Sequence, residues 1–151
     1  MNSTIFDRVL KRLRKPTARQ VLAALENPQQ LINTTRNTTL ATSLEIARTS
    51  AERSKGLLGR DALPSGGGLW IVPCESVHTF WMRFPLDLVY VDRSLRVKKV
   101  RNAVGPWRIS ACLSAHSVLE LPAGIILKSG TQPGDQLKIR LAEASARMPE
   151  S

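Results

Sequence analysis

Short apolar runs bounded by turn residues dominate the middle of the chain. The run from Leu86 to Val91 is apolar at every position except Asp87. A run of this kind predicts a strand that is buried on both faces. Comparable patterns predict further strands at residues 69–72, 96–104, 117–121 and 134–141.

Residues 29–48 carry several β-branched threonines and alternate apolar with polar positions, which predicts a hairpin that turns near Arg36-Asn37. Thr49 and Glu52 have the spacing of a helical capping box. We therefore expect a helix over residues 50–60, with Leu57 and Leu58 facing inward, and a short helix or turn over residues 123–129.

The first 28 residues follow a different pattern. Apolar residues recur at helical spacing before Pro16, and basic residues occupy the other face. This predicts a short basic helix, followed by a second one that begins after Thr17. The first helix either binds an anionic membrane surface or a protein partner, or packs on its own domain with a solvated basic face.

Together these patterns predict a mainly β fold: a small antiparallel β-sandwich or half-barrel with two or three short helices at its edges. We expect a basic helical extension at residues 1–28, the β domain at residues 29–145 and a polar tail at residues 146–151. A chain of 151 residues, 42% hydrophobic and 23% charged, suffices for one such domain.

Charge adds a second theme, because the formal net charge is +10. Between residues 93 and 108 there are six basic side chains and no acidic one. Such a patch favours an anionic partner. Its candidate contacts are Lys98, Lys99, Arg101 and Arg108, with Trp107 available for stacking on a base. Aromatic residues make up only 5% of the chain and no known nucleic-acid motif occurs, so nucleic acid is the less favoured partner.

Targeting signals do not stand out in the sequence. No apolar run has the length of a membrane span, and the first residues lack the pattern of a secretory signal. We therefore expect a cytoplasmic protein, with peripheral binding to the inner membrane as the alternative if the basic helix contacts lipid.

Several short motifs follow one another along the chain in a recognisable order. They are Lys55-Gly56-Leu57-Leu58-Gly59-Arg60, His78-Thr79-Phe80-Trp81-Met82, Pro85-Leu86-Asp87, Val118-Leu119-Glu120-Leu121-Pro122-Ala123-Gly124 and Gly134-Asp135. In this order the chain resembles domain-of-unknown-function family 192, found in bacteria and archaea, over residues 38–141. The resemblance implies a compact, mainly β domain and no particular activity. Where many relatives have methionine, this chain has Leu58, a substitution that packing tolerates.

Two Cys-x-x-x-His pairs, Cys74 with His78 and Cys112 with His116, repeat one spacing. Two thiolates and two imidazoles can bind zinc if the two loops meet, so zinc is the one cofactor the sequence suggests. A disulfide between the cysteines is an alternative that a reducing compartment disfavours, and two free, partly buried thiols are another. A thiol enzyme would need a base and an orienting carboxylate as well.

Asp87 and Glu120 are carboxylates placed in apolar strands. A buried carboxylate needs a partner, because burying it alone is costly. Arg83, His78 and His116 are candidate partners, and a carboxylate that binds backbone N–H groups is the purely structural alternative. Functionally, such carboxylates bind cations or act in acid–base chemistry.

These residues lead to two hypotheses about function. The first is a non-enzymatic binding or accessory module with a polar pocket. Its candidate residues are His78, Met82, Asp87, His116 and Glu120, together with Trp107, which could line the pocket or an interface. The second is a metal-dependent or thiol enzyme built on the two Cys-x-x-x-His pairs. Residues 79–82 are expected to enter a packed strand, with Trp81 in the core.

Overall fold

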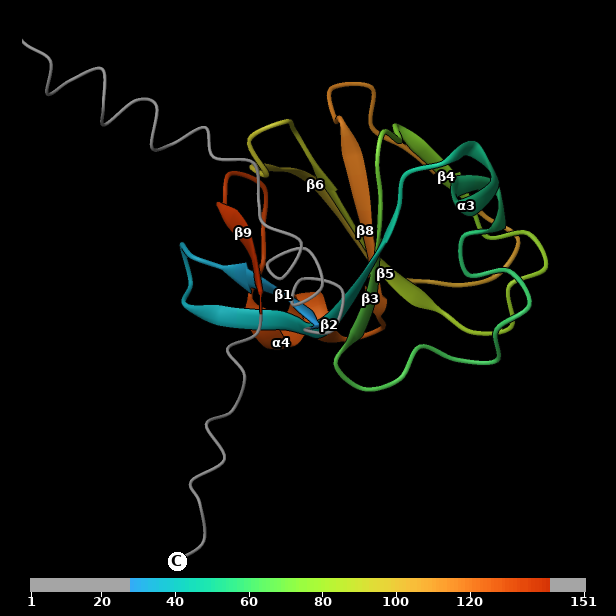
Figure 1. The fold of residues 1–151 in the computed structure, drawn as a ribbon, viewed down its shortest axis with the longest axis horizontal. Coiled ribbons are helices and arrows are strands. Elements are labelled where there is room, and N and C mark those ends of the chain that lie inside the picture. Colours follow the sequence, from blue (N-terminus) through green and yellow to red (C-terminus); the bar gives the residue numbers. More distant parts are fainter. Residues whose placement is uncertain (1–27, 142–151) are drawn as a thin grey trace, which may run out of the picture. The chain divides into compact units, whose positions relative to one another are not determined.

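The computed structural model describes residues 28–141. Its main element is a seven-stranded β-sheet (Figure 1). Its strands follow the order β6-β5-β8-β3-β2-β1-β9. They are β1 (Gln29–Asn33), β2 (Thr38–Ala47), β3 (Gly67–Ile71), β5 (Leu86–Val91), β6 (Val97–Val104), β8 (Ser117–Pro122) and β9 (Leu137–Leu141). A separate ribbon pairs β4 (Ser76–His78) with β7 (Ile109–Ala111), and the helices are α3 (Ser50–Lys55) and α4 (Ile125–Ser129).

The sheet is mixed, which corrects the expectation of a purely antiparallel one. β2 and β3 run parallel, in register from Ser43 opposite Gly67 to Ala47 opposite Ile71. Every other pairing in the sheet is antiparallel. The parallel pair is possible because the chain between β2 and β3 includes α3 and a long loop, and parallel neighbours require such a crossover.

The sheet curls until its two edge strands approach each other at one end, as a half-barrel does. Arg96 and Gln136 form an isolated antiparallel bridge between the start of β6 and the start of β9. The Leu137 N–H donates to the Leu95 carbonyl at 2.9 Å, and the Val97 N–H donates to the Asp135 carbonyl at 2.9 Å. The half-barrel expectation is therefore confirmed in preference to a sandwich.

The curl divides the apolar side chains into two clusters. Successive residues of a strand point to opposite faces, so Val89 and Leu119 pack inside the curl while Leu88 and Val118 pack on its outer face. All six residues of β5 are buried, as the sequence predicted. Burying each large aliphatic side chain stabilises the fold by roughly 1.5–3 kcal/mol.

The helix after β2 begins where the capping box predicted, but it is shorter than expected. The Glu52 N–H donates to Thr49 Oγ1 at 3.2 Å, and the Thr49 N–H donates to Glu52 Oε2 at 2.9 Å. The helix ends at Lys55 and is capped by Gly56, whose positive φ of 46° is a conformation that glycine adopts without a steric penalty. Leu57 is buried in the turn that follows.

Other sequence predictions hold to different extents. The hairpin forms with its turn at residues 34–37, and residues 125–129 form the short helix. The two strands of the ribbon were not predicted. Residues 79–82 do not enter a packed strand: they form a loop in which Trp81 is 66% exposed. The predicted basic extension at residues 1–28, apart from Pro28, and the predicted polar tail at residues 146–151 lie outside the described residues.

Candidate functional site

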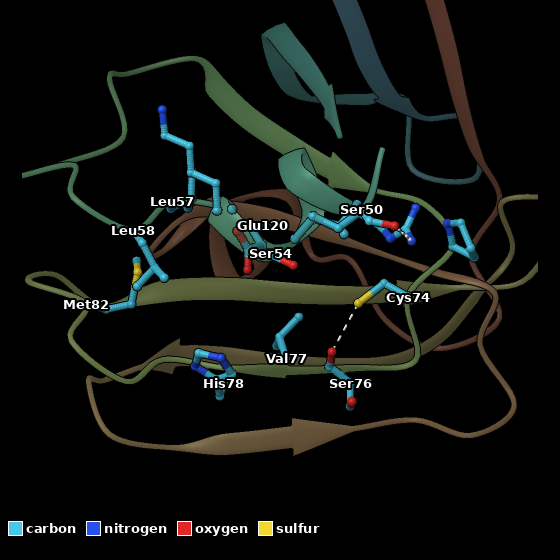
Figure 2. A pocket seen from close by; sticks show the side chains of 15 residues that line it. Ser50, Ser54, Leu57, Leu58, Cys74, Ser76, Val77, His78, Met82 and Glu120 are labelled. Atoms are coloured by element: carbon cyan, nitrogen blue, oxygen red, sulfur yellow. Dashed lines mark hydrogen bonds between the residues drawn. The ribbon is translucent and has the colours of Figure 1, made fainter. Parts of the chain in front are cut away.

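A pocket of about 380 Å³ opens between α3, the segment after β3 and the outer face of β8 (Figure 2). Four of the residues singled out in the sequence line it: Cys74, His78, Met82 and Glu120. Leu57 and other residues of α3 and the turn after it complete the lining. Sequence reasoning missed the contribution of α3, because the capping box predicted the helix but not the strand over which it lies.

Glu120 is the chemically unusual residue of this pocket. It lies in the middle of β8, between Leu69 of β3 and Leu88 of β5, and is 6% exposed. Its Oε2 atom is buried and has no hydrogen-bond partner within residues 28–141. Burial raises the pKa of Glu120 to about 7, against a smaller opposing effect of the Arg60 charge. At neutral pH the side chain is therefore a mixture of acid and carboxylate.

The nearby cation Arg60 is already paired with another carboxylate. Its Nη1 and Nη2 atoms donate to the two carboxylate oxygens of Glu45 at 2.8 and 2.7 Å. Glu45 lies opposite Leu69, which in turn lies opposite Glu120, so the three residues form one row across the sheet. This ion pair lowers the pKa of Glu45 and leaves Glu120 without a salt-bridge partner in the described part of the chain.

Cys74 contributes a neutral thiol to the pocket. Its sulfur is turned toward Ser76 in Figure 2 and donates to the Ser76 carbonyl at 3.1 Å. Burial raises the pKa of Cys74, and the Ser76 contact only partly opposes this. The thiolate is the nucleophilic form of cysteine, so this environment is the opposite of the one that activates a catalytic thiol.

The second Cys-x-x-x-His pair runs beside the first, because the Cys74 N–H donates to the His116 carbonyl at 2.9 Å and the Cys112 N–H donates to the Glu75 carbonyl at 2.8 Å, but its side chains do not line the pocket. Cys112 Sγ contacts Ser114 Oγ at 3.5 Å, and His116 lines a different hollow, of about 420 Å³, with Glu75 and Asp92. Across residues 28–141, no three His, Cys, Asp or Glu side chains are grouped so that they could hold a metal ion. Both thiols are free and partly buried. Zinc binding stays a prediction from the sequence, without a set of ligands that the described residues bring together.

Asp87 is fully buried but does not line the pocket. Its Oδ1 accepts from the Ala103 N–H at 2.8 Å, and its Oδ2 accepts from the N–H groups of Gly124 at 3.1 Å and Ile126 at 2.8 Å. These bonds hold the end of β6 and the start of α4. The purely structural alternative considered for this residue, a carboxylate that binds backbone N–H groups, is therefore the arrangement in the fold.

The basic patch is divided by the fold. Lys98, Arg101 and Arg108 are exposed. Lys99 is partly buried: its Nζ donates to the Ala111 carbonyl at 2.7 Å and lies 5.9 Å from the centre of the Tyr90 ring. Lys99 thus joins β6 to the ribbon, and the other three remain available to a partner. Trp107 lies outside the pocket lining, in an exposed loop.

Comparison with known proteins identifies the family of this chain. The model of domain-of-unknown-function family 192, described as "Uncharacterized ACR", matches residues 31–139. The chain belongs to this family. The resemblance drawn from the motifs is thereby confirmed, and three of those motifs contribute Gly56, His78 and Glu120 to the lining of the pocket.

Relatives of this family member include two archaeal proteins. A UPF0127 protein of Thermococcus sibiricus is 27% identical over 125 residues, which cover 79% of this chain and 80% of that protein. A UPF0127 protein of Pyrococcus horikoshii is 29% identical over 116 residues, which cover 72% of this chain and 96% of that protein.

Two solved structures share the fold. A protein of unknown function from Novosphingobium aromaticivorans has a TM-score of 0.64 and 26% identity, over 74% of this chain and 83% of that one. A protein titled a putative transcription regulator, from Sinorhizobium meliloti, has a TM-score of 0.64 and 24% identity, over 73% of this chain and 90% of that one. The second likeness shows the fold alone. Among the described helices, none is long and apolar enough to cross a membrane.

Proposed function

We propose that this protein is a binding module whose pocket takes a small molecule that offers a hydrogen-bond donor to Glu120. The observation that carries the proposal is the buried, unpartnered Oε2 atom of Glu120 at the wall of an open pocket. Leaving such a group without a partner costs roughly 1–3 kcal/mol. Nothing in the packing of β8 requires that cost, because the flanking positions Leu69 and Leu88 are aliphatic.

The lining limits the kind of ligand. About 380 Å³ is at the lower end of the volumes of small-molecule sites, which run from roughly 300 to 1,000 Å³. Leu57 and Met82 offer apolar contact, and Glu120 offers the polar one. A compound with a short apolar body and one amine or amide therefore fits. A cationic amine would favour the carboxylate form of Glu120, because an adjacent positive charge lowers the pKa of a carboxyl group.

Ligand-observed NMR with paired fragments tests this proposal. Each pair has one apolar body and carries either a primary amine or a methyl group. We expect the amine members to bind the wild-type protein and to lose binding in Glu120→Leu. Glu75→Gln is the matched control, because it removes an exposed carboxylate next to Cys74 that does not line the pocket.

The same screen can overturn the proposal. Equal binding of the amine and methyl members, or amine binding that survives Glu120→Leu, would show that Glu120 does not recognise a donor. Glu120→Gln is a further check, because the glutamine amide keeps an acceptor oxygen and has nearly the same volume as the glutamate side chain. It should bind neutral amides while losing cationic amines.

A further inference from the structure

An exposed cluster of aromatic rings lies outside the pocket lining, at one end of the β4–β7 ribbon. Phe80 lies 5.0 Å from His78 and 5.6 Å from Trp107, measured between ring centres. Trp81 packs against Trp107 at 5.1 Å and meets Phe80 edge to face at 6.0 Å. We call Phe80, Trp81 and Trp107 the aromatic cluster. The two tryptophans are 66% and 55% exposed, so the fold gains little from their burial.

Both tryptophans are held in an unfavourable backbone conformation. Trp81 and Trp107 each have a φ of 60°, in the left-handed region that bulky residues rarely adopt. Backbone strain of this kind persists only where the surrounding structure enforces it, and it concentrates at binding and catalytic sites. Stabilisation of the fold therefore does not account for these two exposed, strained tryptophans, whereas recognition of a ligand does.

Thr79 is the residue that enforces this geometry. It is 2% exposed, and its hydroxyl donates to the Gly105 carbonyl at 2.7 Å and accepts from the Arg108 N–H at 2.9 Å. Its own N–H donates to the Arg108 carbonyl at 2.8 Å, and its carbonyl accepts from the N–H groups of Trp107 at 3.0 Å and Met82 at 3.2 Å. Thr79 therefore fixes the two tryptophan loops relative to each other.

The surroundings of the cluster are basic. Arg108 directly follows Trp107 and is exposed. Arg101 is exposed on the same face of β6 as Lys99, whose bond to the Ala111 carbonyl places that face beside β7. Residues 93–119 contain no aspartate or glutamate. On the side of Trp107 the charge beside the cluster is therefore complementary to a polyanion, and on the side of Trp81 the exposed Arg83 is paired with Asp61.

The geometry points to a binding site for single-stranded nucleic acid, in which bases stack on Trp81 and Trp107 and phosphates contact Arg101 and Arg108. Fixed aromatic rings beside basic side chains are what single-strand binding requires, since every base offers a flat face and every linkage a negative charge. Insertion into a lipid surface would need only exposed apolar area, with no fixed ring orientation. The site is separate from the Glu120 pocket, although His78 borders both.

The test uses the full-length protein and a fluorescein-labelled oligothymidylate of about twelve nucleotides, titrated by fluorescence anisotropy at about 50 mM salt. In the key variant, Trp81→Asn and Trp107→Asn are combined. Asparagine tolerates the left-handed conformation, so this change removes the rings without adding backbone strain. We expect binding to weaken at least about ten-fold, with thermal stability equal to or above that of the wild type.

Matched variants separate stacking from charge. Arg101→Gln with Arg108→Gln should weaken binding and reduce its salt dependence, because phosphate contacts release counterions. Leu113→Ala is the control: Leu113 is 84% exposed and lies beyond the other end of β7, so this change should leave binding within about two-fold of wild type.

Competition experiments decide between kinds of partner. Polyphosphate, which has charges but no bases, should displace the oligonucleotide only at much higher phosphate concentration. The proposal would be overturned if polyphosphate competed as well as the oligonucleotide, or if the double asparagine variant bound with wild-type affinity. Either result would show that binding depends only on nonspecific charge. Wild-type binding to vesicles containing phosphatidylserine, lost in the asparagine variant, together with no oligonucleotide binding, would overturn it in favour of a lipid surface. A large loss of thermal stability in the asparagine variant would make the cluster structural and also overturn it.

Discussion

Asp87 and Glu120 lie one residue out of register on the neighbouring strands β5 and β8, and their side chains point to opposite faces of the sheet. Both are buried, with 0% and 6% exposure. Asp87 accepts three backbone hydrogen bonds, whereas Glu120 Oε2 accepts none within the described chain. Two carboxylates with similar burial therefore have different hydrogen-bonding environments, and mutation of each should have a different effect.

Removing the Asp87 carboxylate should destabilise the fold. Asp87→Ala leaves three backbone N–H groups without their acceptor, and buried donors without partners are costly. We expect the free energy of unfolding to fall by about 3 kcal/mol, measured by urea denaturation. Asp92→Ala is the control, because Asp92 Oδ1 accepts two backbone N–H groups near the surface. A loss no larger than in the control would show that Asp87 does not hold the loops.

Replacing Glu120 with an apolar residue should have the opposite effect. Glu120→Leu removes a buried group without a partner and extends the aliphatic row formed with Leu69 and Leu88. We expect the free energy of unfolding at pH 8 to rise by about 1–3 kcal/mol. Residues kept for binding at the expense of stability behave in this way. A destabilised Glu120→Leu protein would instead assign Glu120 to the support of the fold.

Stability should also depend on pH through Glu120. Its pKa in the folded protein, about 7, lies above its ordinary value of 4.5. Between these values the folded state holds a proton that the unfolded state has lost, so stability falls as the pH rises through this window. Relative to Glu120→Gln, which does not titrate, the wild type should lose up to roughly 3 kcal/mol between pH 4.5 and 8. A constant difference between the two proteins across this range would contradict a buried, unpaired carboxyl.

The Cys74 thiol should react slowly. Burial raises its pKa, so less thiolate is present at neutral pH than for an exposed cysteine. In a Cys112→Ser background, alkylation by iodoacetamide at pH 7.5 can be followed by intact mass. We expect a rate at least about ten-fold below that of the same protein unfolded in urea. A rate above the unfolded one would reopen the hypothesis of a thiol enzyme.

Local patterns predicted much of the fold because they depend on neighbouring residues. The hairpin after Gln29, the start of the helix at Thr49 and the two-faced strand ending at Val91 all follow from spacing alone. The ribbon was missed because its strands have three residues each, too few for alternation to be recognised. The parallel pairing of β2 with β3 depends on contacts between distant residues, which the local pattern does not contain.

For a related reason, the structure brings only some of the candidate residues together at one pocket. Cys74, His78, Met82 and Glu120 do meet at one pocket, while Asp87, His116 and Trp107 do not line it. The face on which a strand residue lies depends on the register of its neighbours, and a shift of one residue reverses that face. Sequence spacing could therefore identify Asp87 as buried without showing that it points away from Glu120. The conformation of Trp81 likewise depends on the hydrogen bonds that the Thr79 carbonyl accepts from Met82 and from Trp107 in a distant loop.

The pairing of the first described strand with the last has a consequence for synthesis of the chain. Gln29 lies opposite Leu141 and Asn33 lies opposite Leu137, so β1 obtains its outer partner only when β9 has left the ribosome. Until then β1 presents an unpaired strand edge, to which another chain can add. The pairing of β1 with β9 joins the two ends of the described chain, and pairing between residues so distant along the sequence is typical of slow folding. Translation that stops before residue 137 would therefore leave β1 with an unpaired edge to which another chain can bind.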